Sequence, residues 1–289
     1  MIRIADGWKD FSVLATGDGY KLERWGEHIL LRPDPQVIWH AQRDLFGYPG
    51  LSAVYRRSEK GGGAWEYKKP LPQSWNIGYK DLTFKIMPMG LKHTGLFPEQ
   101  AANWERTGAL VRRAVAEGRK VKVLNLFAYT GGASVALAKA GAEVTHVDAA
   151  KGMVERAGEN ARLSGIASGI RYIIDDCKKF VLRELRRGNR YDAVVMDPPS
   201  YGRGPGGEMW KIETELYPFV KLCAELLSDD PLFFLINSYT TGLQPAVLSN
   251  ILTLCLAGRA GRIEAYEVGL PTEEKIPLPC GAGGIYIHD

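Results

Sequence analysis

A chain of 289 residues with 45% hydrophobic and 24% charged residues has the composition of an ordinary globular protein with a substantial core. Its longest apolar runs, such as residues 232–236, are too short to span a bilayer, so we expect a soluble protein without membrane contact. The net charge of +4 permits a nucleic-acid partner without requiring one. The first 90 residues hold 13 Lys and Arg against 10 Asp and Glu.

The four cysteines, Cys177, Cys223, Cys255 and Cys280, are scattered along the chain. None of them belongs to a C-x-x-C pair or lies beside a histidine at metal-ligand spacing. The sequence therefore predicts neither a metal site nor a disulfide framework, and it favours the reducing cytoplasm.

Residues 1–90 predict a small β-rich domain built of hairpins, one of them turning at Gly61–Gly63. Basic and aromatic residues alternate in its second half. They are Arg56, Arg57, Lys60, Trp65, Tyr67, Lys68, Lys69 and Trp75. Such a set could stack bases and neutralise phosphates. In the alternative interpretation, the aromatic rings pack a small β core while the charges face solvent.

Residues 91–289 predict a second domain of a different type. After a helix from Pro98 to Glu117, short apolar segments alternate with amphipathic ones. The predicted strands are 121–127, 143–147, 170–174, 192–196, 232–236, 263–268 and 284–287; the predicted helices between them are 134–140, 153–164, 178–187, 213–227 and 245–256. This alternation predicts an α/β fold with a mostly parallel sheet, whose ligands lie at the carboxyl ends of the strands.

The first of these strands enters the turn Ala128–Gly132, which leads into a helix. A strand that runs through glycines into a helix N-terminus brings backbone N–H groups and a positive dipole end to one point. The third glycine of the dinucleotide-binding fingerprint is absent. A plain strand-to-helix turn is the alternative interpretation.

Acidic residues follow the next three strands. Asp148 is placed to accept hydrogen bonds from a ribose diol, and Asp176 with the Cys177 N–H is placed to meet an adenine ring. Asp197 opens the run Asp-Pro-Pro-Ser-Tyr. Each of these acids could instead be a helix N-cap. The two prolines give a rigid platform, on which the Pro198 carbonyl and the Asp197 carboxylate can accept from a planar amino group while Tyr201 stacks on a base.

The runs VLNLFAYTGGASVALAKAGAEVTHVD, YIIDDCKKFV and YDAVVMDPPSYGRG resemble class I S-adenosylmethionine-dependent methyltransferases. The branch with the bacterial large-subunit ribosomal RNA methyltransferases is the most similar, over residues 92–287. The segment KHTGLFPEQAANW is similar to a segment of that branch that helps enclose the cofactor. The resemblance implies a Rossmann-like seven-stranded sheet with an antiparallel last strand and helices on both faces, beside the small β-rich domain.

The resemblance also implies roles for individual residues. The cofactor S-adenosylmethionine would contact Lys92, Thr94, Gly95, Phe127, Ala128, Tyr129, Thr130, Gly131, Gly132, Asp148, Ala149, Asp176 and Cys177. The target base would face Asp197, Pro198 and Tyr201. The loop Lys92–Gln100 is either a lid or a polar connector, and the glycine-rich loop Gly202–Lys211 is likewise either a mobile lid or an exposed connector.

The sequence departs from the branch in ways that bear on the chemistry. His93 separates Lys92 from Thr94, and the nucleophilic cysteine that cytosine-C5 enzymes carry after the fifth strand is absent from residues 237–240. Cys280, in a Pro- and Gly-flanked segment, is a relocated candidate. We expect a cytoplasmic methyltransferase that acts on RNA, most simply ribosomal RNA. A methyltransferase for protein or small molecules, a non-catalytic nucleic-acid-binding protein and a nucleotide-dependent oxidoreductase are the alternatives.

Overall fold

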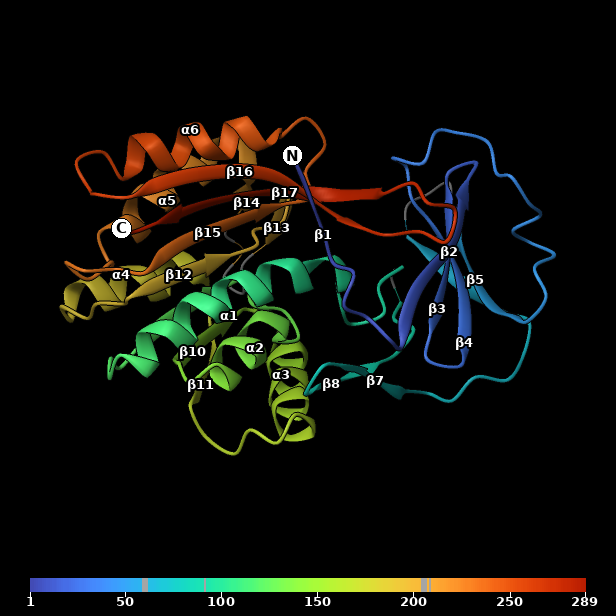
Figure 1. Ribbon diagram of the computed structural model, residues 1–289, viewed down its shortest axis with the longest axis horizontal. Helices are drawn as coiled ribbons and strands as arrows, with labels where there is room; N and C mark the ends of the chain where they lie inside the picture. Colours follow the sequence, from blue (N-terminus) through green and yellow to red (C-terminus); the bar gives the residue numbers. More distant parts are fainter. Residues whose placement is uncertain (59–61, 91, 204–206, 208) are drawn as a thin grey trace. The chain divides into compact units, whose positions relative to one another are not determined.

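The computed structural model describes residues 1–58, 62–90, 92–203, 207 and 209–289. The chain forms two compact units, and each is described by itself (Figure 1). The larger unit comprises residues 1–3, 103–268 and 281–289. The smaller unit comprises residues 4–102 and 269–280. The domain boundary expected at residue 90 stays a prediction.

Among the described residues, the larger unit is built on an eight-stranded sheet in the order β1-β16-β17-β15-β12-β9-β10-β11. Its strands are β1 (Ile2–Ile4), β9 (Lys122–Leu126), β10 (Glu143–Asp148), β11 (Ile170–Ile174), β12 (Ala193–Met196), β15 (Phe233–Ser238), β16 (Arg262–Leu270) and β17 (Leu278–Ile287). The five consecutive strands from β15 to the edge strand β11 pair in parallel, and β17 pairs antiparallel with β15. The predicted mostly parallel α/β sheet is confirmed.

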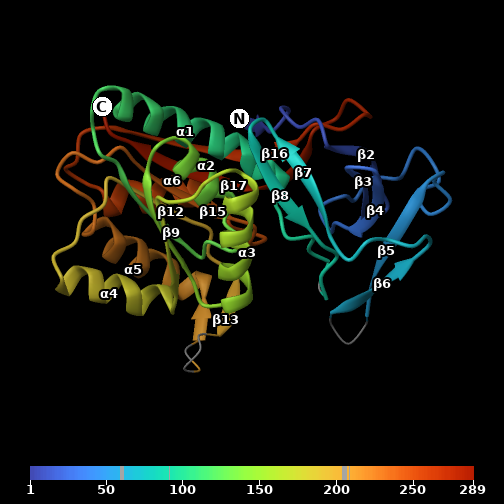
Figure 2. The same ribbon diagram turned by 90° about the horizontal axis from the view of Figure 1, so that it is seen from below.

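Helices cover both faces of this sheet. They are α1 (Ala101–Ala116), α2 (Gly132–Lys139), α3 (Lys151–Leu163), α4 (Cys177–Arg186), α5 (Ile212–Ala224) and α6 (Pro245–Cys255). Side chains of β9 alternate between the faces: Val123 packs with α1 and α2, whereas Leu124 packs with α4, α5 and α6. Figure 2 shows α1 and α2 on one side of the sheet and α4 and α5 on the other. No helix among the described residues has the length and apolarity to cross a membrane.

Two parts of the sheet differ from the predicted elements. The edge strand β1 was not predicted, since three residues carry too little periodicity to be read. The strand β17 begins at Leu278 rather than Gly284. Its glycines are there for packing and not for a turn: a Cβ at Gly283 would lie 2.7 Å from the Tyr266 ring, and one at Gly284 would lie 2.8 Å from Leu248.

The smaller unit is β-rich, as predicted. Its five-stranded sheet has the order of the chain and contains β2 (Phe11–Gly17), β3 (Tyr20–Trp25), β4 (His28–Pro33), β5 (Leu51–Arg57) and β6 (Gly63–Tyr67). A separate hairpin joins β7 (Trp75–Tyr79) to β8 (Leu82–Ile86). The antiparallel strands β5 and β6 flank residues 58–62, of which Glu59, Lys60 and Gly61 lie outside the described residues, and Gly63 of the predicted turn is the first residue of β6.

Aromatic side chains of the smaller unit support the packing interpretation. The indole N–H of Trp65 donates to the carbonyl of Met89 over 2.8 Å, and that of Trp75 donates to the carbonyl of Trp25 over 2.9 Å. Tyr67, by contrast, is exposed. The two tryptophans are therefore fixed to the backbone of their own unit, which leaves Tyr67 as the accessible ring of the three.

Candidate cofactor and substrate site

The turn after β9 has an unusual backbone. Phe127 and Tyr129 have φ of 53° and 51°, although neither is a glycine, and Gly131 has φ of 83° at the N-cap of α2. A Cβ at Gly131 would lie 2.7 Å from Ala157, and one at Gly132 would lie 2.6 Å from the Trp104 ring. Both glycines are thus required by the close approach of α3 and α1, so the turn is held in one shape.

Asp148, the last residue of β10, stabilises this turn by hydrogen bonds to backbone N–H groups. Its carboxylate accepts a hydrogen bond from the Tyr129 N–H over 2.8 Å and another from the Ala150 N–H over 2.9 Å. Burial raises the pKa of Asp148, while the two hydrogen bonds oppose that rise. Each carboxylate oxygen accepts only one of these bonds, so a lone pair stays available on each for a polar ligand.

The end of β11 closes the same edge of the sheet. Asp176 is the N-cap of α4, and its carboxylate accepts from the Lys179 N–H over 2.8 Å. The buried Cys177 thiol has a role that the sequence did not suggest, because its Sγ accepts from the Phe127 N–H over 3.3 Å. Burial raises the pKa of this thiol far above its ordinary value. Cys177 thereby fixes the start of the turn as a neutral side chain.

Asp197 and the two prolines follow β12 on the neighbouring strand. The Asp197 N–H donates to the Leu126 carbonyl over 3.4 Å, which ties the platform to the end of β9. After the prolines the chain forms a small hairpin from β13 (Tyr201–Arg203) and β14 (Met209–Lys211). Part of the predicted lid, residues 204–206 and 208, lies outside the described residues.

Trp210 connects the run Asp197–Tyr201 to the turn after β9, and no sequence motif indicates this contact. Its indole N–H donates to the Pro199 carbonyl over 2.7 Å. Its ring centre lies 5.0 Å from that of Phe127 and 5.6 Å from that of Phe219. Tyr201 stays exposed on the hairpin, with its hydroxyl 3.3 Å from the Met209 sulfur.

At the end of β15, where cytosine-C5 enzymes have a cysteine, this chain has a buried network of hydrogen-bonded side chains. Asn237 accepts from the Asn103 side-chain amide over 2.9 Å, and the Tyr266 hydroxyl donates to Asn103 over 2.6 Å. All three residues are buried. The position beside the target base in cytosine-C5 enzymes is therefore occupied here by a satisfied amide, which offers no nucleophile.

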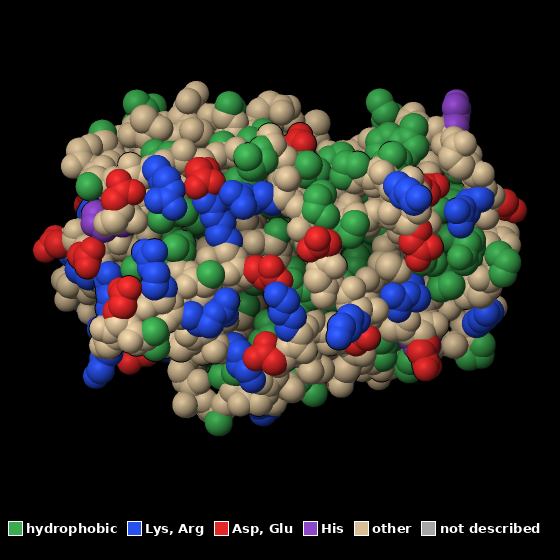
Figure 3. Space-filling model, in the orientation of Figure 1, with side chains coloured by type: hydrophobic (Ala, Val, Ile, Leu, Met, Phe, Trp, Pro, Cys, Tyr) green, Lys and Arg blue, Asp and Glu red, His purple; other side chains and the backbone are tan. Residues whose placement is uncertain are grey.

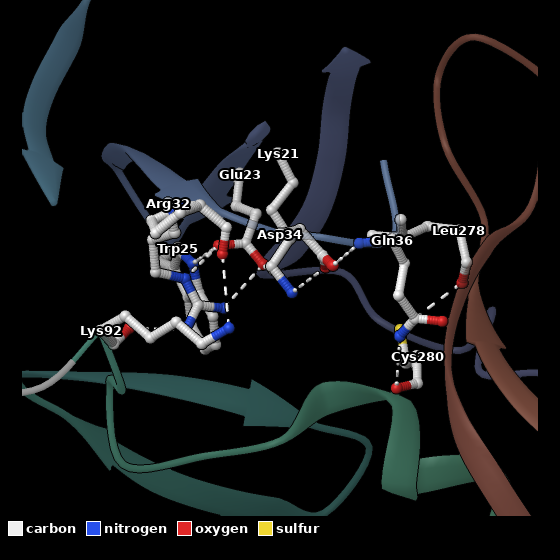
Figure 4. Close-up of polar contacts among 10 residues, drawn as sticks. Lys21, Glu23, Trp25, Arg32, Asp34, Gln36, Lys92, Leu278 and Cys280 are labelled. Carbon is white, nitrogen blue, oxygen red and sulfur yellow. Dashed lines mark hydrogen bonds and ion pairs between the residues drawn. The ribbon is translucent and has the colours of Figure 1, made fainter. Parts of the chain in front are cut away.

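Lys92, Thr94 and Gly95 belong to the smaller unit, so their contact with the cofactor stays a prediction. Within that unit Lys92 is firmly held (Figure 4). Its carbonyl accepts from Arg32 over 3.0 Å, and Arg32 forms an ion pair with the fully buried Glu23. Burial lowers the pKa of the Lys92 amine to about 8.

Cys280 lies in the same unit beside this ionic cluster (Figure 4). It is buried, and its thiol donates to the Leu278 carbonyl with sulfur and oxygen 3.5 Å apart. Burial raises the pKa of the thiol well above its ordinary value. A protonated, buried thiol is a poor nucleophile, which argues against Cys280 as the relocated catalytic cysteine.

A sequence model of the family described as S-adenosylmethionine-dependent methyltransferase matches residues 49–227. The chain belongs to this family. The predicted family is thus confirmed, and the match begins at residue 49 rather than near Lys92. It decides against the nucleotide-dependent oxidoreductase.

The relatives of this chain include ribosomal RNA methyltransferases. Ribosomal RNA large subunit methyltransferase I of Aeromonas salmonicida is 38% identical over 112 residues, which are 37% of this chain and 26% of that protein. Ribosomal RNA large subunit methyltransferase K of Neisseria meningitidis serogroup B is 25% identical over 245 residues, 79% of this chain and 65% of that protein. This chain therefore matches only about a quarter of the length of the first relative.

Solved structures agree over the whole chain. The crystal structure of the SAM-dependent methyltransferase from Agrobacterium tumefaciens has a TM-score of 0.93 and 32% identity, and the match covers 100% of this chain and 94% of that one. A structure complexed with SAH, the demethylated cofactor, has a TM-score of 0.76 and 18% identity over 97% of this chain and 76% of that one. The second likeness shows the fold alone.

The residues at the carboxyl edge fit S-adenosylmethionine, the cofactor for which the family is named. The partly buried Asp148 carboxylate suits a pair of ribose hydroxyls, since carboxylates are strong acceptors of hydrogen bonds. Cys177 is the first residue of α4, where helix geometry leaves N–H groups without an intrahelical acceptor and thus available to a ring nitrogen. The donors and acceptors of this family member therefore match both ends of an adenosine.

Proposed function

We propose that this chain transfers a methyl group from S-adenosylmethionine to RNA, in the cytoplasm, with a nucleotide of ribosomal RNA as the target. The observation that carries the proposal is the link through Trp210 between the Phe127 turn, which we assign to the cofactor, and Pro199, which we assign to the substrate platform. The ribosomal RNA methyltransferases among the relatives support RNA as the substrate class. The free thiols of all four cysteines agree with a reducing compartment.

The proposed mechanism is alignment and desolvation. The cofactor supplies a methyl group that its positive sulfur already makes electrophilic. The Gly131 turn and Asp148 would hold the cofactor, and the Asp197 carboxylate with the Pro198 carbonyl would accept hydrogen bonds from the planar amino group of a base. Phe127 and Trp210 would exclude water from the path between them. Orientation of this kind supplies much of the rate in displacement reactions.

The nucleophile in this proposal is a ring nitrogen, an exocyclic nitrogen or a ribose oxygen. Methylation at carbon-5 of a pyrimidine needs a thiolate that adds to carbon-6 of the ring. Cys177 is engaged with Phe127, Cys223 is buried, and Cys280 donates to Leu278. Burial raises the pKa of all three thiols, which opposes thiolate formation at each.

The decisive experiment compares modified nucleosides in RNA from cells with and without the gene, by mass spectrometry. A methylated nucleoside that is lost on deletion, and restored by the wild-type gene but not by Asp197→Ala, supports the proposal. Unchanged nucleosides in every RNA fraction would contradict it. In that case, methyl transfer from labelled cofactor to protein or small-molecule extracts would identify one of the other substrate classes.

Cys280→Ser tests the chemistry of the target atom. We expect near-normal methyl transfer to total RNA, because the buried thiol is assigned no part in the reaction. A variant that binds cofactor normally but transfers no methyl group would instead make Cys280 the nucleophile.

A further inference from the structure

A short segment of the larger unit carries an excess of positive charge. Residues 171–190 contain seven Lys and Arg against three Asp and Glu, a net charge of +4 that equals the net charge of the whole chain. On the face drawn in Figure 3, by contrast, basic and acidic side chains are interspersed. The seven cations are Arg171, Lys178, Lys179, Arg183, Arg186, Arg187 and Arg190. Five of them are arginines.

Local ion pairs neutralise only part of this charge. Lys178 pairs with Glu215, Arg183 with Asp175, and Arg187 with Glu184. Within the part of the chain that the structure describes, Arg171, Arg186 and Arg190 form no salt bridge, and all three are exposed. Cations stabilise the last turn of a helix, but that effect accounts only for Arg183 and Arg186.

An open hollow of about 750 Å³ is lined in part by Arg171 and Arg190. It is at the amino ends of the parallel strands, and its charged lining residues are Lys122, Glu143, Arg171, Glu184 and Arg190. The six residues of β10 separate this edge from Asp148 by about 17 Å, at roughly 3.3 Å per residue. The hollow is thus a different place from the cofactor site.

The buried acid of the hollow is already fully engaged. The Glu184 carboxylate accepts from the Tyr191 hydroxyl over 2.7 Å, from Asn189 over 2.8 Å and from Arg187 over 3.1 Å. The three cations of the lining, Lys122, Arg171 and Arg190, outnumber its two acids, Glu143 and Glu184, and Glu184 is also paired with Arg187 from outside the lining. The lining of the hollow therefore has a net positive charge, which favours an anionic ligand.

Arginine is the side chain best suited to phosphate, because its planar guanidinium donates two parallel hydrogen bonds. Arg186 lies in the last turn of α4, Arg187 and Arg190 follow the helix, and Arg171 lies on β11. Arg171 and Arg190 also line the hollow, so the cations extend from the end of α4 to the hollow. An anion that repeats along a chain can contact several such cations at once, whereas a single small anion cannot.

We propose that the basic face, defined as Arg171, Arg186, Arg187 and Arg190 with the adjoining hollow, binds the sugar-phosphate backbone of the RNA substrate away from the reacting nucleotide. The inference rests on the proposed function: the basic face would be a second contact with the RNA whose nucleotide reacts at the strand-end site. Backbone contacts of this kind are independent of sequence and supply affinity and register, whereas the strand-end site supplies chemistry.

The test uses the full chain and a fluorescein-labelled single-stranded RNA 20-mer of mixed sequence. The variant replaces Arg171, Arg186 and Arg190 by glutamine. Its matched control replaces Arg112, Arg113 and Lys120 by glutamine, which removes the same charge from exposed positions on α1 and the residues after it. Anisotropy titrations over a range of salt concentrations give the affinity and its salt dependence, and calorimetry with SAH reports on the cofactor site.

We expect the basic-face variant to bind RNA about tenfold or more weakly at low salt, and its log–log salt slope to fall by about 2 because each single-strand phosphate contact contributes roughly 0.7. Binding of SAH and thermal melting should match the wild type, and the control should keep most of the RNA affinity. Equal losses in variant and control would overturn the proposal, since net charge alone would then explain them. A wild-type protein that binds no RNA would overturn it too.

The two proposals fail in different ways. If the wild type methylates RNA and the basic-face variant does so with unchanged KM, the basic face is wrong and the proposed function stands. If the variant loses salt-dependent RNA binding but the wild type methylates no RNA, the basic face stands and the proposed reaction is wrong. If the protein binds a labelled acidic peptide and unlabelled RNA does not displace that peptide, the partner of the basic face is a protein and not RNA.

Discussion

Trp210 donates its indole N–H to the carbonyl of Pro199, with nitrogen and oxygen 2.7 Å apart, while its ring packs 5.0 Å from that of Phe127. One side chain thus bonds to the proposed substrate platform and packs against the residue that opens the proposed cofactor turn. Phe127 is itself held by Cys177 at the start of α4. We therefore infer that Trp210 positions the two halves of the proposed site relative to each other.

Trp210→Phe keeps a ring against Phe127 and removes the bond to Pro199. We expect methyl transfer to RNA to fall about two- to tenfold, in line with about 0.5–1.5 kcal/mol for one hydrogen bond, while SAH affinity stays within twofold. Single-turnover transfer and calorimetry measure the two quantities. Trp75→Phe, which removes a similar indole bond in the smaller unit, is the control. A loss of SAH affinity as large as the loss of transfer would contradict the assignment of Trp210 to the platform.

Asp148→Asn removes the charge and keeps one oxygen acceptor beside Tyr129 and Ala150. We expect SAH to bind at least about tenfold more weakly, about 1.4 kcal/mol, because neutral acceptors hold ribose hydroxyls less strongly than carboxylates do. Calorimetry measures the change, and thermal melting without ligand checks that the turn is intact. Unchanged SAH affinity with a lowered melting temperature would make Asp148 a purely structural residue.

Much of the larger unit could be predicted because its local signals agree with each other. Val123 and Leu124 face opposite covered sides of the sheet, so the apolar run at β9 was readable as a buried parallel strand. Every predicted helix of the strand–helix alternation is present, with ends displaced by a few residues at most. The antiparallel last strand followed from the family resemblance rather than from periodicity.

The contacts that assemble the site could not be predicted, because they join residues distant in the sequence. Nothing around Trp210 indicates that it reaches Pro199, and a cysteine in an adenine-binding position gives no sign that its sulfur accepts from Phe127. The start of the last strand was predicted too late in the sequence: Gly281 and Gly283 lie within β17, where Gly283 makes room for the Tyr266 ring. Packing requirements of this kind appear only once the partners are in place.

Asp197→Ala is expected to abolish methyl transfer and to leave SAH affinity within a few-fold, because the acid is assigned to the substrate. Asp197→Asn, which can still accept one hydrogen bond, should keep a measurable fraction of activity. Transfer to total RNA and calorimetry with SAH are the two measurements. If both variants bind SAH as poorly as Asp148→Asn does, Asp197 belongs to the cofactor site.

We expect a buried polar cluster next to the turn after β9 to make stability depend on pH. The Ser134 hydroxyl accepts from Asn125 over 2.9 Å and lies 2.9 Å from Nδ1 of His146, so we infer that it donates to that nitrogen. His146 is fully buried, and among the described residues its Nε2 has no hydrogen-bond partner. Burial lowers the pKa of His146 from 6.5 to about 4, which keeps the ring neutral.

His146→Gln is expected to flatten the acid side of the stability curve. As the pH falls, the unfolded chain binds a proton at His146 near pH 6.5, while the folded chain does so only near pH 4. Stability present above pH 6.5 is therefore lost between these values, by about 2–3 kcal/mol at pH 4.5 on the scale of 1.36 kcal/mol per pKa unit. Urea unfolding at pH 7 and 4.5 measures the loss in wild type and variant. The pKa of His93 is also lowered to about 4, but His93 is present in both proteins, so its contribution cancels in the difference between them.

The control is His40→Gln at an exposed position, which should lose as much stability between pH 7 and 4.5 as the wild type does. Equal losses in the wild type and in His146→Gln would show that His146 does not carry the effect.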